Sequence, residues 1–148
     1  MKIYIGADHA GFELKEKLKA HLHESGYSFE DKGAYTLDET DDYPDFCRPV
    51  AEAVIADPES KGIVIGGSGI GEAIVANRTH GIRASIYYGG ALDIIKLSRE
   101  HNDANVISLP GKRVSEDEAK KIIDTWLETE FTNEERHKRR IAKIEEFS

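Results

Sequence analysis

A glycine-rich segment that ends in a glutamate is the part of this sequence best suited to chemistry. The residues GGSGIG at 66–71 follow the apolar run GIVI at 62–65, and Glu72 comes directly after them. A strand, a glycine turn and a helix in this order leave backbone N–H groups free to hold an anion. A carboxylate beside such donors suits proton abstraction next to a carbonyl, with Glu72 as the base and the amides stabilising an enediolate oxygen. A tight turn followed by a glutamate that the helix dipole favours explains these residues equally well.

The same segment departs from three common motifs. The dinucleotide pattern G-x-G-x-x-G fails because Glu72 stands where the third glycine belongs. Gly66 and Gly71 have the spacing of a nucleotide P-loop, but Glu72 replaces its lysine and would repel a triphosphate. The nucleophile elbow G-x-S-x-G fails because Ile70 takes the place of its last glycine. What remains is a group of backbone donors beside a carboxylate.

Two histidines are candidate proton carriers. His9 follows Asp8 at the end of the first apolar run, and His101 with Asn102 ends a helical stretch. A histidine near its ordinary pKa of ~6.5 can transfer protons at neutral pH. Two surface histidines with local hydrogen bonds would give the same pattern. No histidine has a second ligand at helical spacing, so we expect neither a metal site nor a cofactor.

Four cations fall within residues 136–140 of an otherwise acidic chain. Arg136 and Arg140 lie one helical turn apart, where two like charges cost roughly 0.2–0.5 kcal/mol in an isolated helix. A bound dianion such as a phosphate monoester would reverse this cost, because arginine binds it bidentately. The alternative interpretation is a solvated face, balanced by glutamates at 134, 135, 145 and 146.

Short apolar runs alternate with helical patterns along the whole chain. Strands are expected at 3–5, 27–29, 62–65, 83–87 and 106–109, and helices at 12–25, 44–57, from about 72, at 91–100 and at 115–130. A last helix is expected from Thr132, which forms a capping-box pattern with Glu135. This order predicts a three-layer α/β fold, in which a five-stranded parallel sheet has helices on both faces and an extra C-terminal helix. Ligands in such sheets bind beyond the carboxyl ends of the strands.

The composition excludes several classes of protein. A length of 148 residues suits one domain, 1–148, and the net charge of -8 disfavours nucleic-acid or membrane binding. No apolar run approaches the ~20 residues of a membrane span, and the first residues lack a signal-peptide layout, so we expect a cytoplasmic protein. The single cysteine, Cys47, rules out an internal disulfide. The last helix has no strand after it to cover, which favours packing on a second copy.

Seven short motifs together resemble the type-B ribose-5-phosphate isomerases, a family that also contains galactose-6-phosphate isomerase subunits and allose-6-phosphate isomerases. The resemblance covers essentially the whole chain. The motifs are GADHAG at 6–11, DYPD at 42–45, GSGIG at 67–71, AN at 76–77, GIRA at 81–84, REHN at 99–102, and Arg136-His137 with Arg140. It implies a metal-free aldose–ketose isomerase with a Rossmann-like fold, acting through an enediolate. It also implies that two subunits, in a homodimer or a tetramer, share each active site.

The resemblance assigns a role to each matching residue. Asp8 and His101 would assist ring opening, with His101 as the proton donor, and Glu72 would be the base. The glycine segment would hold the reacting sugar oxygens through Gly67, Ser68, Gly69, Ile70 and Gly71. Sugar hydroxyls would contact Asn102 and Tyr43, and the phosphate would bind His9, Arg136 and Arg140.

Two departures from the family pattern bear on these roles. Many members carry a cysteine base where this chain has Gly66, and others combine glycine there with a glutamate at position 72, as this chain does. The family also has an arginine three residues before the cap of the fifth helix, where this chain has Lys112 followed by Arg113. Lysine binds phosphate as a point charge and not bidentately.

Other activities are compatible with these residues. The substrate could be a six-carbon sugar phosphate, allose 6-phosphate or galactose 6-phosphate, in place of ribose 5-phosphate. The chain could also be a non-catalytic subunit of a hetero-oligomeric isomerase, although it keeps Asp8, Glu72 and His101. A flavin- or nucleotide-binding module is a third alternative, against which the absence of a lysine in the glycine segment counts.

Overall fold

A computed structural model describes residues 1–147 of the chain. Strands and helices alternate as the apolar pattern predicts. In chain order the elements are β1 (Lys2–Ala7), α1 (Phe12–Glu24), β2 (Ser28–Asp31), α2 (Pro44–Ala56), β3 (Lys61–Gly66), α3 (Ile70–Asn77), β4 (Ala84–Ile86), α4 (Leu92–Glu100), β5 (Val106–Pro110), α5 (Glu116–Glu128) and α6 (Glu135–Glu145). No helix in this part of the chain is long and apolar enough to cross a membrane.

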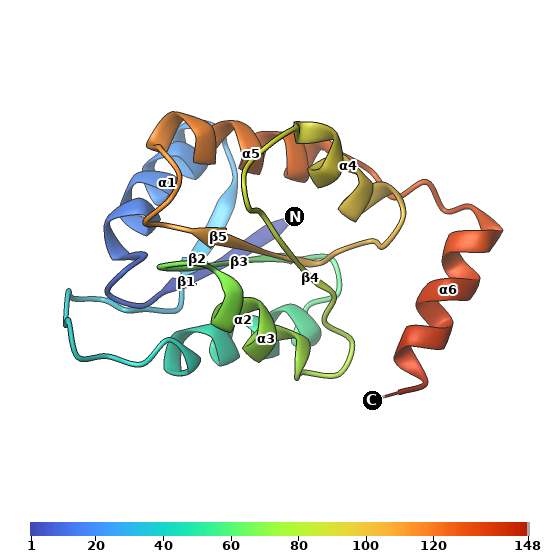
Figure 1. Cartoon of the computed structure of the whole chain (residues 1–148), viewed down its shortest axis with the longest axis horizontal. Coiled ribbons are helices and arrows are strands. Elements are labelled where there is room, and N and C mark those ends of the chain that lie inside the picture. The colour runs from blue at the N-terminus through green and yellow to red at the C-terminus, as the bar shows by residue number, and fades with distance from the viewer. Residues whose placement is uncertain (148) are drawn as a thin grey trace.

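The five strands form one parallel sheet in the order β2-β1-β3-β5-β4. Helices α1, α4 and α5 cover one face of the sheet, and α2 and α3 cover the other (Figure 1). The predicted three-layer α/β fold is therefore confirmed. The chain moves to one side of β1 to form β2 and to its other side to form β3, so the order reverses between β1 and β3. Parallel sheets bind ligands at such a switch point, beyond the carboxyl ends of the two strands.

Alternate residues of the central strands fill two separate cores. Ile5, Ile63 and Leu109 point to the side of α1 and α5, where they pack with Trp126. Val64 and other residues of intervening positions point to the side of α2, which contributes Cys47, Val50 and Val54. Both faces of β1, β3 and β5 are buried, which explains why these strands are nearly continuous apolar runs. The ends of these buried strands hold the loops of the candidate active site in place.

Two predicted helix starts were wrong. The last helix begins at Glu135, and Thr132 does not cap it. The Thr132 hydroxyl donates instead to the carbonyl of Glu100, 2.8 Å away, and ties the segment before α6 to the end of α4. Helix α3 begins at Ile70, two residues before the predicted start. Its N-cap is Gly69, whose φ of 77° lies in the left-handed region that glycine adopts at no steric cost.

Helix α6 stands apart from the sheet and its covering helices (Figure 1). Of its residues only His137 is buried, with 2% of its surface exposed. The His137 ring stacks on the His101 ring with centroids 4.2 Å apart. The far end of α6 is tied down by Glu145, which accepts a hydrogen bond of 2.8 Å from Arg83. The basic face of α6 therefore projects from the body of the chain.

Candidate active site

Glu72 lies at the carboxyl end of β3, in the first turn of α3, and only 3% of its surface is exposed. It belongs to the buried face of α3 together with Ala73 and Ala76. Burial raises the pKa of the Glu72 carboxyl, because it disfavours the charged form, and the nearby charge of Asp8 adds to the increase. Backbone N–H groups of Gly69 and of Glu72 itself act in the opposite direction. This buried carboxyl is thus a stronger base than one in water.

Gly66 leaves room for the Glu72 carboxylate because it has no side chain. A Cβ atom at position 66 would lie only 1.6 Å from Glu72 Oε1, so no other residue fits while the carboxylate keeps this position. The resemblance described above pairs a glycine at position 66 with a glutamate at position 72. The close approach supplies a physical reason for that pairing, since the two side chains would occupy the same volume.

Tyr43, which precedes α2, lies over the glycine segment. A Cβ atom at Gly71 would be 2.6 Å from Tyr43 Cζ and 2.7 Å from its hydroxyl oxygen. Tyr43 is 37% exposed. It therefore lies against Gly71 in the first turn of α3 and is open to solvent on part of its surface.

The glycine segment is hydrogen-bonded to β5 and to the turn that follows β5. Ser108, fully buried, donates a hydrogen bond of 2.6 Å to the carbonyl of Gly69. The N–H of Gly111 donates to the carbonyl of Gly66 at 2.7 Å, and that of Lys112 to the carbonyl of Gly67 at 3.3 Å. These bonds bring Lys112 next to the glycine segment. Ser108 is a residue that the sequence analysis missed, because a single serine in a buried strand gives no signal.

The backbone amides of the segment are only partly free. The Ser68 hydroxyl oxygen accepts a hydrogen bond of 3.2 Å from the N–H of Ile70. The N–H groups of Ser68 and Gly71 have no hydrogen-bond partner among residues 1–147. The N–H of Gly69 points to the Glu72 carboxylate. Two amides next to the Glu72 carboxylate therefore remain as donors for an oxygen of a ligand.

Asp8 and His9 follow β1 and reach the same edge of the sheet. Asp8 is buried, and its Oδ1 atom accepts hydrogen bonds from the N–H groups of Ala10, at 2.9 Å, and Gly11, at 3.2 Å. A Cβ atom at Gly11 would lie 2.4 Å from the carbonyl oxygen of Ile65, so this turn packs directly on the end of β3. The turn after β1 thus places Asp8 near Glu72.

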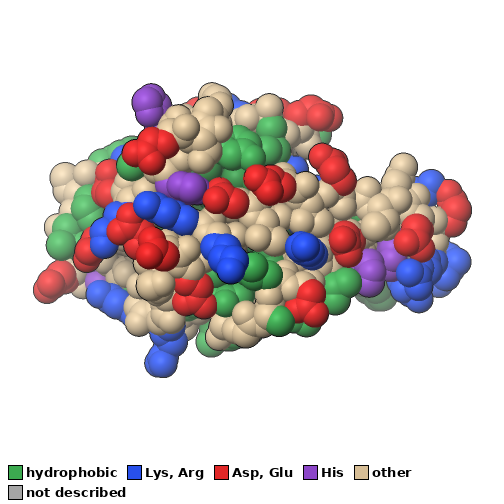
Figure 2. Space-filling view, turned by 90° about the horizontal axis from the view of Figure 1, so that it is seen from above, with side chains coloured by type: hydrophobic (Ala, Val, Ile, Leu, Met, Phe, Trp, Pro, Cys, Tyr) green, Lys and Arg blue, Asp and Glu red, His purple; other side chains and the backbone are tan. Residues whose placement is uncertain are grey.

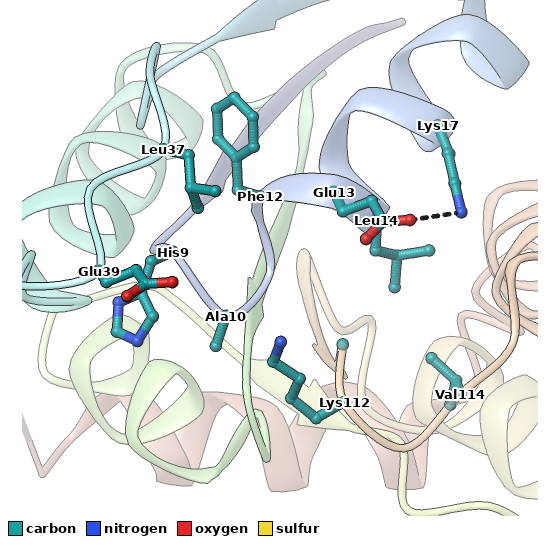
Figure 3. Close-up of a pocket in the computed structure, with 11 residues that line it drawn as sticks. His9, Ala10, Phe12, Glu13, Leu14, Lys17, Leu37, Glu39, Lys112 and Val114 are labelled. Atoms are coloured by element: carbon teal, nitrogen blue, oxygen red, sulfur yellow. Dashed lines mark ion pairs between the residues drawn. The ribbon is translucent and has the colours of Figure 1, made fainter.

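His9 is held by a partner from the loop between β2 and α2. Its Nδ1 atom lies 2.7 Å from Asp41 Oδ1, and this bond raises the pKa of the His9 imidazole. The ring lines a cavity of about 620 Å³ together with Lys112 (Figure 3). Other side chains around this cavity include Phe12, Glu13, Lys17, Leu37, Glu39 and Val114. The sequence analysis missed Asp41, because it stands in an acidic run, 38–42, whose members look alike.

The other predicted residues lie at the opposite edge of the sheet. His101 caps the end of α4 and Asn102 comes before β5, so both lie at the amino end of that strand. Strand β5 has five residues, which corresponds to roughly 16 Å between its two ends. Arg136 and Arg140 lie on the exposed α6, where Lys and Arg side chains gather around a histidine (Figure 2). The predicted site residues therefore form two separate groups within one chain.

The predicted site residues fall into a carboxyl-edge group and an amino-edge group. The carboxyl-edge group consists of Asp8, His9, Tyr43, Gly67, Ser68, Gly69, Ile70, Gly71, Glu72 and Lys112. The amino-edge group consists of His101, Asn102, Arg136 and Arg140. The first group holds a buried carboxyl, free amides, and an imidazole and an ammonium group beside a cavity. The second offers an imidazole, an amide and two exposed guanidinium groups.

Comparisons with known proteins agree with this fold and show the family. A model of the Ribose/Galactose Isomerase family matches residues 3–144. The chain is 44% identical over 147 residues to ribose-5-phosphate isomerase B of Mycolicibacterium paratuberculosis, covering 99% of this chain and 91% of the relative. It is 40% identical to the Escherichia coli enzyme of the same name over 146 residues, covering 97% of this chain and 93% of the relative.

A solved structure adds a bound ligand to the comparison. Ribose-5-phosphate isomerase B of Mycoplasma genitalium, solved with bound ribulose 5-phosphate, superposes with a TM-score of 0.93 at 35% identity and covers 99% of this chain and 95% of that one. The fold and the family match are those of a sugar isomerase. The chain belongs to the Ribose/Galactose Isomerase family.

Proposed function

We propose that this protein interconverts ribose 5-phosphate and ribulose 5-phosphate by proton transfer through an enediolate. The observation that carries the proposal is the buried Glu72 carboxylate, packed on Gly66 and next to two free backbone amides. Family relatives named ribose-5-phosphate isomerase B, one of them solved with ribulose 5-phosphate, support this choice of substrate. A substrate with this charge does not cross a bilayer unaided, which favours a cytoplasmic enzyme.

The base in this proposal is Glu72. Its carboxylate removes the proton from C2 of the open-chain aldose, and the electron pair of that C–H bond forms the C1–C2 double bond of an enediolate. The N–H groups of Ser68 and Gly71 stabilise the negative oxygen that develops. The carboxyl then returns the proton to C1, and the hydroxyl on C2 passes its proton to the oxygen on C1, which leaves a ketone at C2 and a hydroxyl at C1. The raised pKa of Glu72 brings the base closer to neutral pH, where proton transfer is most efficient.

The remaining residues bind and open the sugar. Asp8 and His101 assist ring opening, with His101 donating a proton to the ring oxygen. Asn102 and Tyr43 contact sugar hydroxyls. The phosphate is bound by His9 and Lys112 of the carboxyl-edge group together with Arg136 and Arg140 of the amino-edge group, and arginine supplies the bidentate contact that Lys112 lacks.

A second copy of the chain completes the site in this proposal. The two groups lie at opposite ends of β5, further apart than a five-carbon sugar phosphate can reach. A homodimer in which each copy brings its amino-edge group to the carboxyl-edge group of the other removes this difficulty. Exposed apolar side chains of Ile70, Ile74 and Tyr88 line one hollow beside the three-residue edge strand β4. They suit an interface, whether the dimer stands alone or pairs into a tetramer.

A substrate comparison tests the proposal. Initial rates of the purified protein with ribose 5-phosphate, allose 6-phosphate and galactose 6-phosphate give three values of kcat/KM. We expect the highest value for ribose 5-phosphate. A higher value for either six-carbon substrate would replace ribose 5-phosphate as the substrate, and no turnover of any of the three would reject an isomerase.

Arg136→Ala should raise the KM for ribose 5-phosphate by roughly tenfold or more, because a charge-assisted contact to the phosphate contributes about 1.5–3 kcal/mol. Its effect on kcat should be smaller, since the phosphate does not react. Steady-state kinetics measure both constants. Arg139→Ala is the matched control, because Arg139 is an exposed neighbour on the same helix that has no place in the proposed site. Equal KM values for the two variants would reject the phosphate role of Arg136.

A further inference from the structure

We propose that Asp41 is a positioning residue, which holds the His9 imidazole in one orientation and one tautomer and favours its protonated form for binding the substrate phosphate. The inference rests on the proposed function, because the phosphate is its ligand. None of the sequence motifs points to Asp41, and the inference depends on its contacts alone.

One oxygen of Asp41 holds His9 at two points. Asp41 Oδ1 accepts a hydrogen bond of 3.0 Å from the backbone N–H of His9 and lies 2.7 Å from the ring atom Nδ1. A backbone donor and a ring donor of the same residue on one acceptor restrict both side-chain torsions of His9. The ring nitrogen Nε2 is left for a ligand, and the ring lines the same cavity as Lys112 (Figure 3).

The Asp41 side chain is more deeply buried than that of His9, and this favours a charged pair. The side chain of Asp41 is only 8% exposed, whereas that of His9 is 36% exposed. The second carboxylate oxygen, Oδ2, is buried and has no hydrogen-bond partner among residues 1–147. A buried carboxylate is costly unless a positive group compensates it. The imidazolium form of His9 is the positive group in direct contact with it.

Other charged groups also face His9. The carboxylates that face it are Asp8 on its own segment and Asp38 and Glu39 on the loop of Asp41. Across the cavity lie Lys112 and the ion pair of Glu13 with Lys17. The hydrogen bond to Asp41 is the largest influence that raises the pKa of His9 above its ordinary value. One side-chain oxygen or nitrogen atom from each of Asp8, His9 and Asp41 lies within 4.8 Å of the other two, and the His9–Asp41 hydrogen bond accounts for the approach of those two residues.

The protonation state of His9 decides what it offers to a phosphate. When protonated, the ring donates from Nδ1 to Asp41 and has a second donor, Nε2–H, for a phosphate oxygen. When neutral, the ring keeps its proton on Nδ1 because of Asp41, and the lone pair on Nε2 would repel the phosphate. A raised pKa means that the binding form persists to higher pH and is lost as the pH rises through that value. Asp41 therefore extends the pH range of tight phosphate binding.

The direct test is a ring-nitrogen NMR titration of His9 in the wild-type protein, Asp41→Asn and Glu39→Gln. Asparagine keeps an oxygen for the His9 N–H but removes the charge. We expect a pKa of His9 above ~6.5 in the wild type, a clear decrease in Asp41→Asn, and a smaller decrease in Glu39→Gln, which removes a nearby charge without a bond to the ring. The neutral ring of the wild type should carry its proton on Nδ1. Identical titrations in the wild type and Asp41→Asn would overturn the inference.

Kinetics separate positioning from a general structural role. Asp41→Asn should raise the KM for ribose 5-phosphate severalfold at pH values between the His9 pKa values that NMR gives for the two proteins, and less at lower pH, where His9 is protonated in both, whereas kcat should change less. A KM increase that is the same at every pH would also overturn the inference. The NMR titration requires no turnover. If the wild-type protein has no isomerase activity, the proposed function is rejected, but the titration still shows whether Asp41 controls the protonation of His9. If Asp41→Asn does not fold, the wild-type tautomer decides, because a neutral His9 with its proton on Nε2 contradicts the inference.

Discussion

Replacing Glu72 by glutamine is expected to lower kcat for ribose 5-phosphate by roughly 10²–10⁴-fold, the range that a positioned base contributes. Glutamine keeps the volume of the side chain and an oxygen that can accept hydrogen bonds, but it cannot take a proton from C2. The KM should change little, because the phosphate and hydroxyl contacts remain. Steady-state rates of the purified variant give both constants. Turnover close to that of the wild type would exclude Glu72 as the base.

The same variant carries its own check on folding. A carboxyl whose pKa is higher in the folded than in the unfolded state destabilises the fold as the pH rises above the unfolded value, because the unfolded chain ionises more easily. Burial raises the pKa of Glu72 in this way. Glu72→Gln should therefore unfold at the same temperature as the wild type at neutral pH, or at a higher one. Glu52→Gln, an exposed glutamate on α2, is the control for loss of one charge and should keep full activity.

Gly66→Ala is expected to reduce kcat by about 10²-fold, the cost of displacing a catalytic group by roughly 1 Å. The new Cβ atom would lie 1.6 Å from Glu72 Oε1, so the carboxylate must move. The fold should survive, because the three atoms nearest to that Cβ all belong to the Glu72 side chain. Steady-state kinetics and circular dichroism of the purified variant measure the two effects.

A double-mutant cycle identifies the cause of the Gly66→Ala loss. In a Glu72→Ala background there is no carboxylate to displace, so the added Gly66→Ala should cost little. Two residues that act through one contact give effects that do not add. If the fold-losses in kcat of the two single variants multiply in the double variant, the effect of Gly66→Ala does not come from displacing the Glu72 carboxylate.

The fold was predictable because each layer leaves a local signal. The strands β1, β3 and β5 are buried on both faces and are therefore continuous apolar runs, and Ser115 does cap α5 by accepting a hydrogen bond from the N–H of Glu118 at 3.1 Å. Thr132 carries the same pattern, but its N–H and its hydroxyl both donate to the carbonyl of Glu100, 32 residues away in the sequence, and α6 begins only at Glu135. Capping patterns predict a helix start only where contacts with distant residues do not fix the segment in another position.

Site residues that directly follow a strand could be predicted from the sequence. Those that depend on contacts between distant parts of the chain could not. Glu72 could be placed near the glycine segment from spacing alone. The shared volume of Gly66 and Glu72 becomes visible only when β3 and α3 are in place. Asp41 is one of four carboxylates in residues 38–42, and only the loop conformation selects it as the partner of His9. The division of the site follows from chain order, because Glu72 comes after a strand whereas His101 and Asn102 come before one.

The most direct test of a site shared between two chains is the activity recovered after two inactive variants, Glu72→Gln and His101→Asn, are mixed. If each site joins Glu72 of one chain to His101 of another, a mixed dimer contains one intact site. Random exchange of subunits in a twofold dimer should then restore about a quarter of the wild-type activity. Native mass spectrometry confirms that mixed dimers have formed. Mixed dimers with no activity above that of the separate variants would show that both residues act within one chain, and the shared site would be wrong.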